Sequence, residues 1–288
     1  MVMPKDMPVR LLRHAQRWVE LASLQLRNWT GKTCVTGGED VVVSLTTYGE
    51  RTKFVHLAIE SIGRGEVRPK RIILWLDEAE SLVNMPAPLQ RLVRRGLEVR
   101  ECANYGPHKK YYPYVAALEG DREIEPLVIV DDDFLYPKTW LQSLLESYKR
   151  YPDAVSCTRA HEVQVQEQIL SYSTWPSCRT DRPSYRTFAT GVGGVLYPAN
   201  VQLTLQKLGT EFARRAPKAD DVWLHYAALY SGVKVRQVST EPLDLEFRIL
   251  PFAQGNSLQT VNVGQGANDR QIASTYDQVT MEALRTNS

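Results

Sequence analysis

The chain has 288 residues, 43% of them hydrophobic, which suffices for one large α/β domain or two small ones with a substantial core. Its 35 Lys and Arg residues nearly balance its 33 Asp and Glu residues, so no overall positive field favours nucleic acid as a partner. The four cysteines are widely spaced without a Cys-x-x-Cys pair, which argues against zinc and favours reduced thiols. We see no secretory signal and no uncharged apolar run of bilayer length, and we expect a cytoplasmic protein.

The first predicted unit, residues 1–38, is an amphipathic helical segment with six Lys and Arg residues against two acids. Its apolar residues fall on one helical stripe: Leu11, Ala15, Trp18, Val19, Ala22 and Leu26. Its arginines lie opposite: Arg10, Arg13, Arg17 and Arg27. Such a helix is able to make peripheral contact with the inner face of an anionic cell membrane. It is equally able to dock its stripe on the domain or on a dimer partner.

Residues 39–150 alternate between apolar strand-like runs and helical periods. The predicted strands are 41–45, 71–76, 97–100 and the run that begins at Leu127. The predicted helices between them carry Val55, Ile59 and Ile62 on one face, span 88–95 before Gly96, and span 112–118. This βαβαβαβ order predicts a parallel sheet with right-handed crossovers.

Residues 151–288 are less regular and form the predicted second half of the same sheet. A helix over 138–148 leads into them, and a strand over 155–157 follows. Residues 162–170 alternate in the manner of a half-exposed antiparallel strand, and 172–186 is expected to be a loop. Further helices are predicted over 201–208 and 221–230, with a strand over 233–238.

Three consecutive carboxylates, Asp131, Asp132 and Asp133, follow the buried run Leu127–Val130. Ligands of open α/β sheets bind outside the carboxyl ends of the strands, so these acids stand where a site is expected. Crowded carboxylates repel one another unless a cation or protons neutralise them, which favours a divalent metal holding a phosphorylated ligand. The alternative is a turn or helix cap, although capping uses only one of the three. Phe134 follows where an EF-hand requires further ligands and a glycine.

Four stretches together resemble the GT-A glycosyltransferases: residues 41–48 (VVVSLTTY), the VDDD motif, Gly191–Gly194 and Ala219–Trp223. Within that class the chain is similar to bacterial, family 2-like enzymes that build polysaccharide or lipopolysaccharide, and the likeness covers about residues 40–270. The resemblance implies an α/β GT-A (Rossmann-like) fold, with a mostly parallel central sheet flanked by helices and a small antiparallel acceptor-side portion. It implies a metal-dependent, inverting transfer of a sugar from a nucleoside-diphosphate donor to a glycan or lipid-linked acceptor. UDP is the nucleotide expected first.

The resemblance also assigns roles to the two acidic clusters. Asp133 is expected to ligate Mn²⁺ or Mg²⁺, while Asp131 contacts the ribose or a metal-bound water and Asp132 turns to backbone hydrogen bonds. Of the pair that opens the later helix, Asp221 is the expected base and Asp220 is expected to contact a sugar, unless one of them only caps that helix. No His follows His225, so the histidine metal ligand found near the C-terminus of some GT-A enzymes has no counterpart here.

Further residues are candidates for donor binding, each with a plainer alternative. Thr46, Thr47 and Tyr48 are expected to cradle the nucleobase and ribose, or to form a polar loop. Arg51 is expected to reach a phosphate or cap a turn, and Asp77 to accept from a uracil imide or face solvent. Lys109 and Lys110 are expected to reach the diphosphate or form a solvated face.

Gly193 and Gly194 are expected to let a sugar ring approach the backbone, or to form a tight turn. The loop with Trp175, Arg179, Arg182 and Arg186 is expected to help define the acceptor. His161 beside it is expected to contact the ligand or to be structural.

Two other classes of function stay open. A haloacid-dehalogenase-like phosphatase also carries Asp-x-Asp after a buried strand, but that strand is early in the chain and a small hydroxyl residue follows, where Leu135 stands here. The third is a non-catalytic carbohydrate-binding or assembly protein.

Overall fold

The computed structural model describes residues 7–78, 82–120, 123–241, 248–250 and 267–286, with side-chain environments from residue 12 onward. Its strands are β1 (Glu39–Thr46), β2 (Pro69–Leu76), β3 (Leu97–Glu101), β4 (Leu127–Ile129), β5 (Val155–Cys157), β6 (Ala160–Glu162), β7 (Thr187–Ala189), β8 (Val195–Tyr197) and β9 (Val235–Gln237). Its α-helices are α1 (Met7–Thr30), α2 (Val55–Gly63), α4 (Ala87–Val93), α5 (Tyr112–Ala116), α6 (Trp140–Arg150), α7 (Ala199–Leu208), α8 (Phe212–Arg215), α9 (Asp220–Tyr230), α11 (Ala267–Thr275) and α12 (Gln278–Thr286). Its 3-10 helices are η2 (Gly49–Lys53), η3 (Gly106–Lys110) and η4 (Tyr172–Thr174).

Seven strands form one mixed sheet in the order β3-β2-β1-β4-β8-β5-β9. Strands β1 to β4 pair in parallel, as the alternation of strands and helices predicts. Strand β8 runs antiparallel between β4 and β5, and β5 pairs in parallel with β9. The expected α/β fold with a mostly parallel central sheet is confirmed, and the sheet continues across the predicted division near residue 150.

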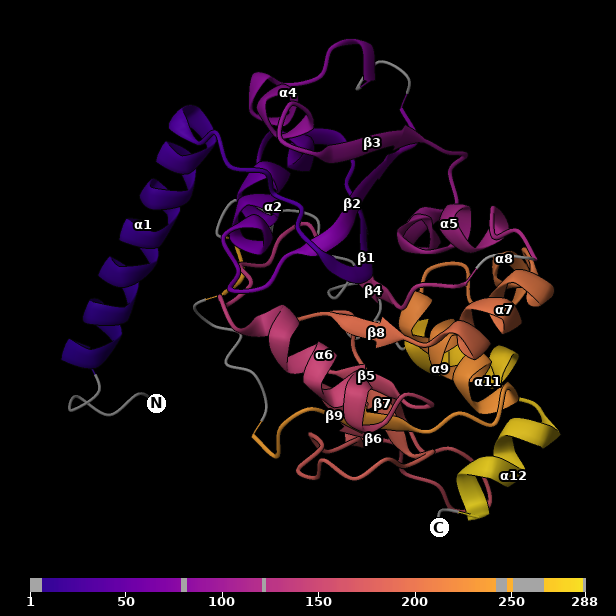
Figure 1. Cartoon of the computed structure of the whole chain (residues 1–288). Helices are drawn as coiled ribbons and strands as arrows, with labels where there is room; N and C mark the ends of the chain where they lie inside the picture. Colours follow the sequence, from indigo (N-terminus) through magenta and orange to yellow (C-terminus); the bar gives the residue numbers. More distant parts are fainter. Residues whose placement is uncertain (1–6, 79–81, 121–122, 242–247, 251–266, 287–288) are drawn as a thin grey trace.

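Helices cover both faces of this sheet (Figure 1). Successive residues of a strand point to opposite faces, so the apolar run in β1 supplies both cores. Val43 belongs to the core shared with α2, α4 and α6, while Val42 belongs to the core shared with α5, α7 and α9. Burial of both faces explains why β1 and β2 are continuous apolar runs.

The sequence missed β8, which lies in the centre of the sheet. It has only three residues, and it follows two glycines with left-handed φ angles, 86° at Gly193 and 93° at Gly194. That conformation turns the chain and lets it enter the sheet against the direction of its neighbours. A three-residue strand is too short to show any periodicity.

The strand predicted over residues 162–170 is wrong. Only Ala160–Glu162 pairs, with β7 in a small antiparallel sheet, and the chain then folds back on itself. There the amide of Gln166 donates to the carbonyl of Gln168 at 3.0 Å, and Val165 bridges Ile169. The residues 172–186 form the expected loop apart from the short η4 turn, but Trp175 is buried in the core rather than offered to a ligand.

Helix α1 packs along α2 and α4 through a different face from the one predicted (Figure 1). Leu21, Leu24 and Asn28 are buried, whereas Val19 and Leu26 of the predicted apolar stripe are exposed. Docking of that stripe on the domain is therefore wrong for the residues described. The side chains of Arg10 and Leu11 lie outside the described environments.

A buried polar network fixes the helix instead. Glu60, fully buried on α2, accepts from Asn28 Nδ2 at 3.1 Å, from Arg27 Nε at 3.2 Å and from Arg95 Nη2 at 3.1 Å. Two arginines and an amide thus satisfy one buried carboxylate, as such groups require. None of the described helices is long and apolar enough to cross a membrane, and all four cysteines are free thiols.

Candidate functional site

The acidic triplet lies directly beyond the carboxyl end of β4, next to the end of β1. Arg51, from the η2 turn after β1, places its Nη2 atom 2.6 Å from Asp132 Oδ1 and 2.6 Å from Asp133 Oδ2. Thr47 Oγ1 donates to Asp132 Oδ2 at 2.6 Å. Asp132 is therefore held by the side chains of Thr47 and Arg51 rather than by the backbone hydrogen bonds expected for it.

The second acidic cluster meets the first one through Lys110. This lysine ends η3 and places its Nζ atom 2.6 Å from Asp131 Oδ1 and 3.1 Å from Asp220 Oδ2. The Asp220 contact is an ion pair without hydrogen-bond geometry, so this buried oxygen lacks a hydrogen-bond donor. Asp221 Oδ1 accepts from the amide of Gly191 at 2.9 Å. Two acidic motifs 89 positions apart thus lie together around one lysine.

Backbone contacts fix the positions of Asp131 and Lys110. The amide of Asp131 donates to the Tyr136 hydroxyl at 2.9 Å, and that hydroxyl donates to the Asp131 carbonyl at 3.1 Å. Ser44 in β1 donates to the carbonyl of Lys110 at 2.5 Å, and Trp75 donates to Ser44 at 3.0 Å. The first sheet strands therefore hold the η3 segment against the acids.

Among the described residues, four of the five carboxylates of this site form ion pairs with two cations, Arg51 and Lys110. The pKa values reflect the negative excess. Burial and the neighbouring acids Asp131 and Asp132 raise the pKa of Asp133 to about 7. Burial and Asp220 raise the pKa of Asp221 to about 8. Burial alone lowers the pKa of Lys110, but the surrounding carboxylates outweigh it and raise that pKa well above the ordinary value.

This charge excess fits a divalent cation. The site offers carboxylate oxygens, which suit Mg²⁺ and Mn²⁺. Among the described residues, no three His, Cys, Asp or Glu side chains converge on one point as ready-made ligands. Arg51 and Lys110 stand between the acids, so a metal ion requires at least one of these cations to give way.

Other predicted donor-site residues have structural partners. Asp77 Oδ1 lies 2.5 Å from Lys109 Nζ, and both side chains are buried, so neither is the solvated group considered as an alternative. Thr46 donates to the carbonyl of Trp75 at 2.9 Å and so serves the sheet. Tyr48 lies at the surface beside the Arg51 guanidinium, which is 5.6 Å from its ring centroid.

The glycines of residues 191–194 serve two different purposes. A Cβ atom on Gly194 would lie 2.7 Å from the Trp140 ring, and the Trp140 indole donates to the carbonyl of Gly193. These two glycines therefore pack against α6. A Cβ atom on Gly191 would lie 3.2 Å from Asp221 Oδ1 and 3.6 Å from Asp131 Oδ1. Gly191, which the sequence did not single out as a site residue, is the glycine that faces the carboxylates.

His161 and the described loop residues have structural partners of their own. His161 Nε2 contacts Arg159 at 3.2 Å, and its ring meets Tyr172 edge-on. Arg186 donates to the carbonyl of Leu284 at 2.8 Å, and the exposed Arg179 pairs with Glu241 at 3.0 Å.

His108 was also missed by the sequence reasoning. It joins η3 to the chain before α9 through hydrogen bonds of 2.8 Å to the Tyr111 hydroxyl and 2.8 Å to the Ala216 carbonyl. Its ring also stacks on Phe212, and no pattern in the sequence indicated this contact.

This mixed sheet, with acids beyond β4 and at the start of α9, is a GT-A fold. The structure is similar to the mannosyltransferase PcManGT from Pyrobaculum calidifontis, solved in complex with GDP-Man and Mn²⁺. The TM-score is 0.52 at 12% sequence identity, over 96% of this chain and 78% of that one. No protein-family model and no curated protein matches the sequence.

Two other solved structures show weaker similarity. The S. aureus TarS fragment 1–349 in complex with UDP-GlcNAc has a TM-score of 0.45 and 13% identity, over 71% of this chain and 57% of that one. The 4-diphosphocytidyl-2C-methyl-D-erythritol synthase from Anaerococcus prevotii has a TM-score of 0.47 and 12% identity, over 82% of this chain and 98% of that one.

Proposed function

We propose that this protein is a metal-dependent, inverting glycosyltransferase that uses a nucleoside-diphosphate sugar, with UDP as the first nucleotide to test. The observation that carries the proposal is the meeting of Asp131 and Asp220 on Lys110, at the carboxyl end of β4. Sugar transfer needs cations for the leaving diphosphate and a base for the acceptor, and both kinds of group are present here.

Donor binding is proposed to use the acids and cations of the first half. Asp133 and Asp131 would hold Mg²⁺ or Mn²⁺, which, when bound, neutralises charge on the diphosphate. Arg51, which pairs with Asp132 and Asp133, would then be available to pair with a donor phosphate. Gly191, which lacks a side chain beside Asp221, leaves room for the transferred sugar.

Transfer is proposed to proceed by a single displacement. The acceptor hydroxyl attacks the anomeric carbon, the bond from that carbon to the diphosphate oxygen breaks, and Asp221 takes the hydroxyl proton. Asp221 must be ionised to act, yet burial and Asp220 raise its pKa to about 8. A divalent cation held by Asp133 and Asp131 would lower that pKa, so the base would become active once the metal is in place.

The acceptor is proposed to be a glycan or lipid-linked glycan of the cell envelope. The exposed Arg179 and Arg182 in the 172–186 loop suit a polar acceptor, whereas the buried Trp175 no longer belongs to that surface. The phosphatase alternative loses its support, because Leu135 is fully buried and packs in a cluster with Leu21 and Leu250.

A panel of nucleotide sugars, tested by calorimetry with and without Mn²⁺, checks this proposal. We expect one sugar nucleotide to bind only with metal, and Asp133→Asn to abolish the metal dependence while the exposed control Asp153→Asn keeps it. Metal-dependent donor affinity that is unchanged in Asp133→Asn contradicts the metal assignment. Glycan binding that survives neutralisation of both acidic clusters, without turnover in the native protein, identifies a non-catalytic binding protein instead.

A further inference from the structure

Helix α1 presents an apolar face to solvent on the side opposite its docked residues. Its exposed side chains, by exposed fraction, are Leu12 at 60%, Trp18 at 53%, Val19 at 70%, Leu26 at 57% and Trp29 at 64%. Because 3.6 residues make one turn, Leu12, Ala15, Val19 and Leu26 follow one line along the helix. We call this line, with its flanking tryptophans, the α1 stripe. Scattered exposed apolar residues are ordinary, but a continuous line of them indicates a binding surface.

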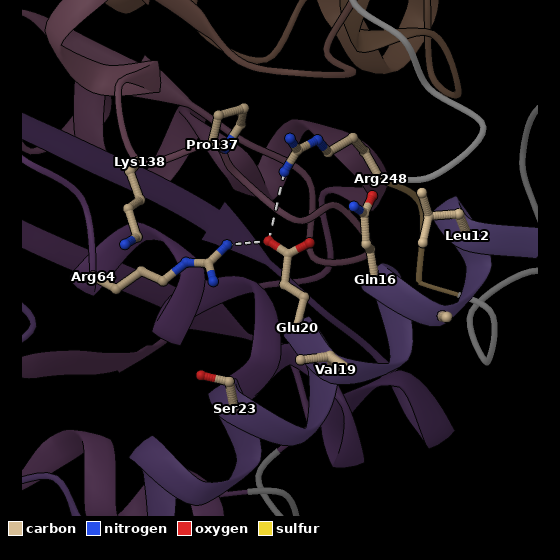
Figure 2. Close-up of a pocket in the computed structure, with 10 residues that line it drawn as sticks. Leu12, Gln16, Val19, Glu20, Ser23, Arg64, Pro137, Lys138 and Arg248 are labelled. Atoms are coloured by element: carbon tan, nitrogen blue, oxygen red, sulfur yellow. Dashed lines mark hydrogen bonds and ion pairs between the residues drawn. The ribbon is translucent and has the colours of Figure 1, made fainter. Parts of the chain in front are cut away.

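A groove of about 650 Å³ runs beside the α1 stripe, between α1 and the body of the domain (Figure 2). Leu12, Ala15 and Val19 of the stripe form its helix side, and Pro137 lies on the opposite side. The apolar stripe and the groove are therefore one continuous surface.

Three cations line the groove: Arg64, Lys138 and Arg248. Figure 2 shows Glu20 between Arg64 and Arg248, both of which form ion pairs with it. The Nε atom of Arg64 is buried without a hydrogen-bond partner, and Lys138 is exposed. One carboxylate thus faces three cations, which leaves the groove with excess positive charge beside an apolar line.

We propose that the α1 stripe and this groove bind the surface of an anionic phospholipid bilayer. The apolar side chains enter the interfacial region, the two tryptophans lie at its polar boundary, and lipid phosphates bind Arg64, Lys138 and Arg248. The combination of apolar insertion and phosphate attraction is what an amphiphilic anionic surface requires. A second copy of the chain suits this face less well, since stripe-to-stripe packing brings two positively charged grooves together.

The groove also has a direct covalent connection to the catalytic acids. Only four residues separate Asp133 from Lys138. The Arg248–Leu250 segment pairs with the start of that stretch, where Ile249 bridges Phe134. Leu135 N donates to the Arg248 carbonyl at 2.8 Å, and Leu250 N donates to the Asp133 carbonyl at 2.7 Å. If the proposed transferase function holds, membrane binding at the groove places the acids close to a lipid-linked acceptor. The binding itself requires no donor, so its test is independent of catalysis.

Vesicle co-sedimentation tests the proposal with the full chain and no nucleotide. We expect binding to phosphatidylglycerol vesicles at low salt, a marked loss in high salt, and little binding to phosphatidylcholine vesicles. Val19→Glu with Leu26→Glu should reduce the bound fraction at least tenfold. The matched control changes two exposed residues far from α1, Leu203→Glu with Val279→Glu, and should bind as the native protein does. Lys138→Glu should weaken binding, with the exposed Lys207→Glu as its control.

Thermal unfolding of every variant shows that the fold is intact, as expected for changes at exposed positions. Vesicle binding by the α1 stripe variant that equals that of its control overturns the proposal. A second outcome also overturns it: the native protein binds no vesicle but forms a dimer in analytical ultracentrifugation, and Val19→Glu with Leu26→Glu abolishes that dimer. A second copy of the chain then covers the stripe.

Discussion

The Nζ atom of Lys110 lies 2.6 Å from Oδ1 of Asp131, and this ion pair joins the η3 turn to the end of β4. The same Nζ lies 3.1 Å from Asp220 at the start of α9. One buried cation therefore holds together acids from both halves of the chain. It also occupies space between carboxylates that a metal ion would otherwise neutralise.

Replacing Lys110 by Gln should destabilise the protein and make its stability depend on divalent metal. Removing one partner of a buried ion pair costs about 3–5 kcal/mol, because the remaining charges lose their compensation. Mg²⁺ can then supply the missing charge. If its Kd is about 0.1 mM, then about 10 mM Mg²⁺, about 100 times the Kd, should restore about 2.7 kcal/mol of stability. Urea unfolding of both proteins with Mg²⁺ and with EDTA measures this. Equal Mg²⁺ effects on the native protein and Lys110→Gln would show that the metal does not replace the charge of this lysine.

The two ends of the glycine motif should respond differently to alanine. Gly194→Ala places a methyl group against Trp140 in a left-handed conformation, and should destabilise the fold by about 1–3 kcal/mol. Gly191→Ala should cost less stability than Gly194→Ala, since its φ lies outside the left-handed region and its closest contact is 3.2 Å rather than 2.7 Å. It should weaken donor binding because its methyl group faces Asp221 and Asp131. Urea unfolding and donor calorimetry on both variants separate the two effects. A Gly191→Ala variant that binds donor normally would remove this glycine from the sugar site.

The sequence predicted the elements that obey strong local rules. The runs in β1 and β2 are apolar because both of their faces are buried, and this signal is visible without a structure. Strand β8 gave no such signal, because three residues paired on both sides depend on distant strands for their position. Helix α1 shows a further limit: its apolar stripe was visible, but the buried acceptor Glu60 makes the helix dock through Arg27 and Asn28 instead.

The candidate site was predictable in its acids but not in its cations. Asp131–Asp133 stand at the end of a strand, and Asp220 and Asp221 at the start of a helix, so local patterns located both clusters. That Lys110 would contact Asp220, 110 positions later, depends on how η3 packs against α9. Gly191 was overlooked in favour of the double glycine beside it, because only the structure shows which glycine faces the acids.

The stability of the site should depend on pH through Asp221. Burial and Asp220 raise its pKa from the ordinary 3.8 to about 8, so the folded protein keeps a proton that the unfolded chain releases between these values. The stabilising contribution of this group is complete below the unfolded pKa and is lost as the pH rises through the folded pKa. Asp221→Asn should therefore gain stability relative to the native protein between pH 5 and pH 8, by at least about 1 kcal/mol.

Urea unfolding at both pH values measures that gain, with Asp153→Asn as the control at an exposed carboxylate. Mg²⁺ should reduce the gain, since a bound cation favours the ionised carboxylate. If Asp221→Asn differs from the native protein in stability by the same amount at pH 5 and at pH 8, Asp221 is already ionised in the folded protein at pH 5.

The final prediction distinguishes chemistry from binding within the second acidic cluster. Asp221→Asn should lower turnover by about 10²-fold or more, the usual effect of losing a positioned base, with little change in donor affinity. The amide oxygen can still accept from Gly191, so the geometry is preserved. Asp220→Asn removes a partner of Lys110 and should mainly weaken binding or stability.

Steady-state kinetics on both variants, together with the anomeric configuration of the product by NMR, provide the measurement. If Asp220→Asn is the inactive variant, the base is Asp220 rather than Asp221, since both acids lie near Lys110 and Asp131. A product that retains the donor's configuration would require a different mechanism, because a single displacement inverts the anomeric carbon.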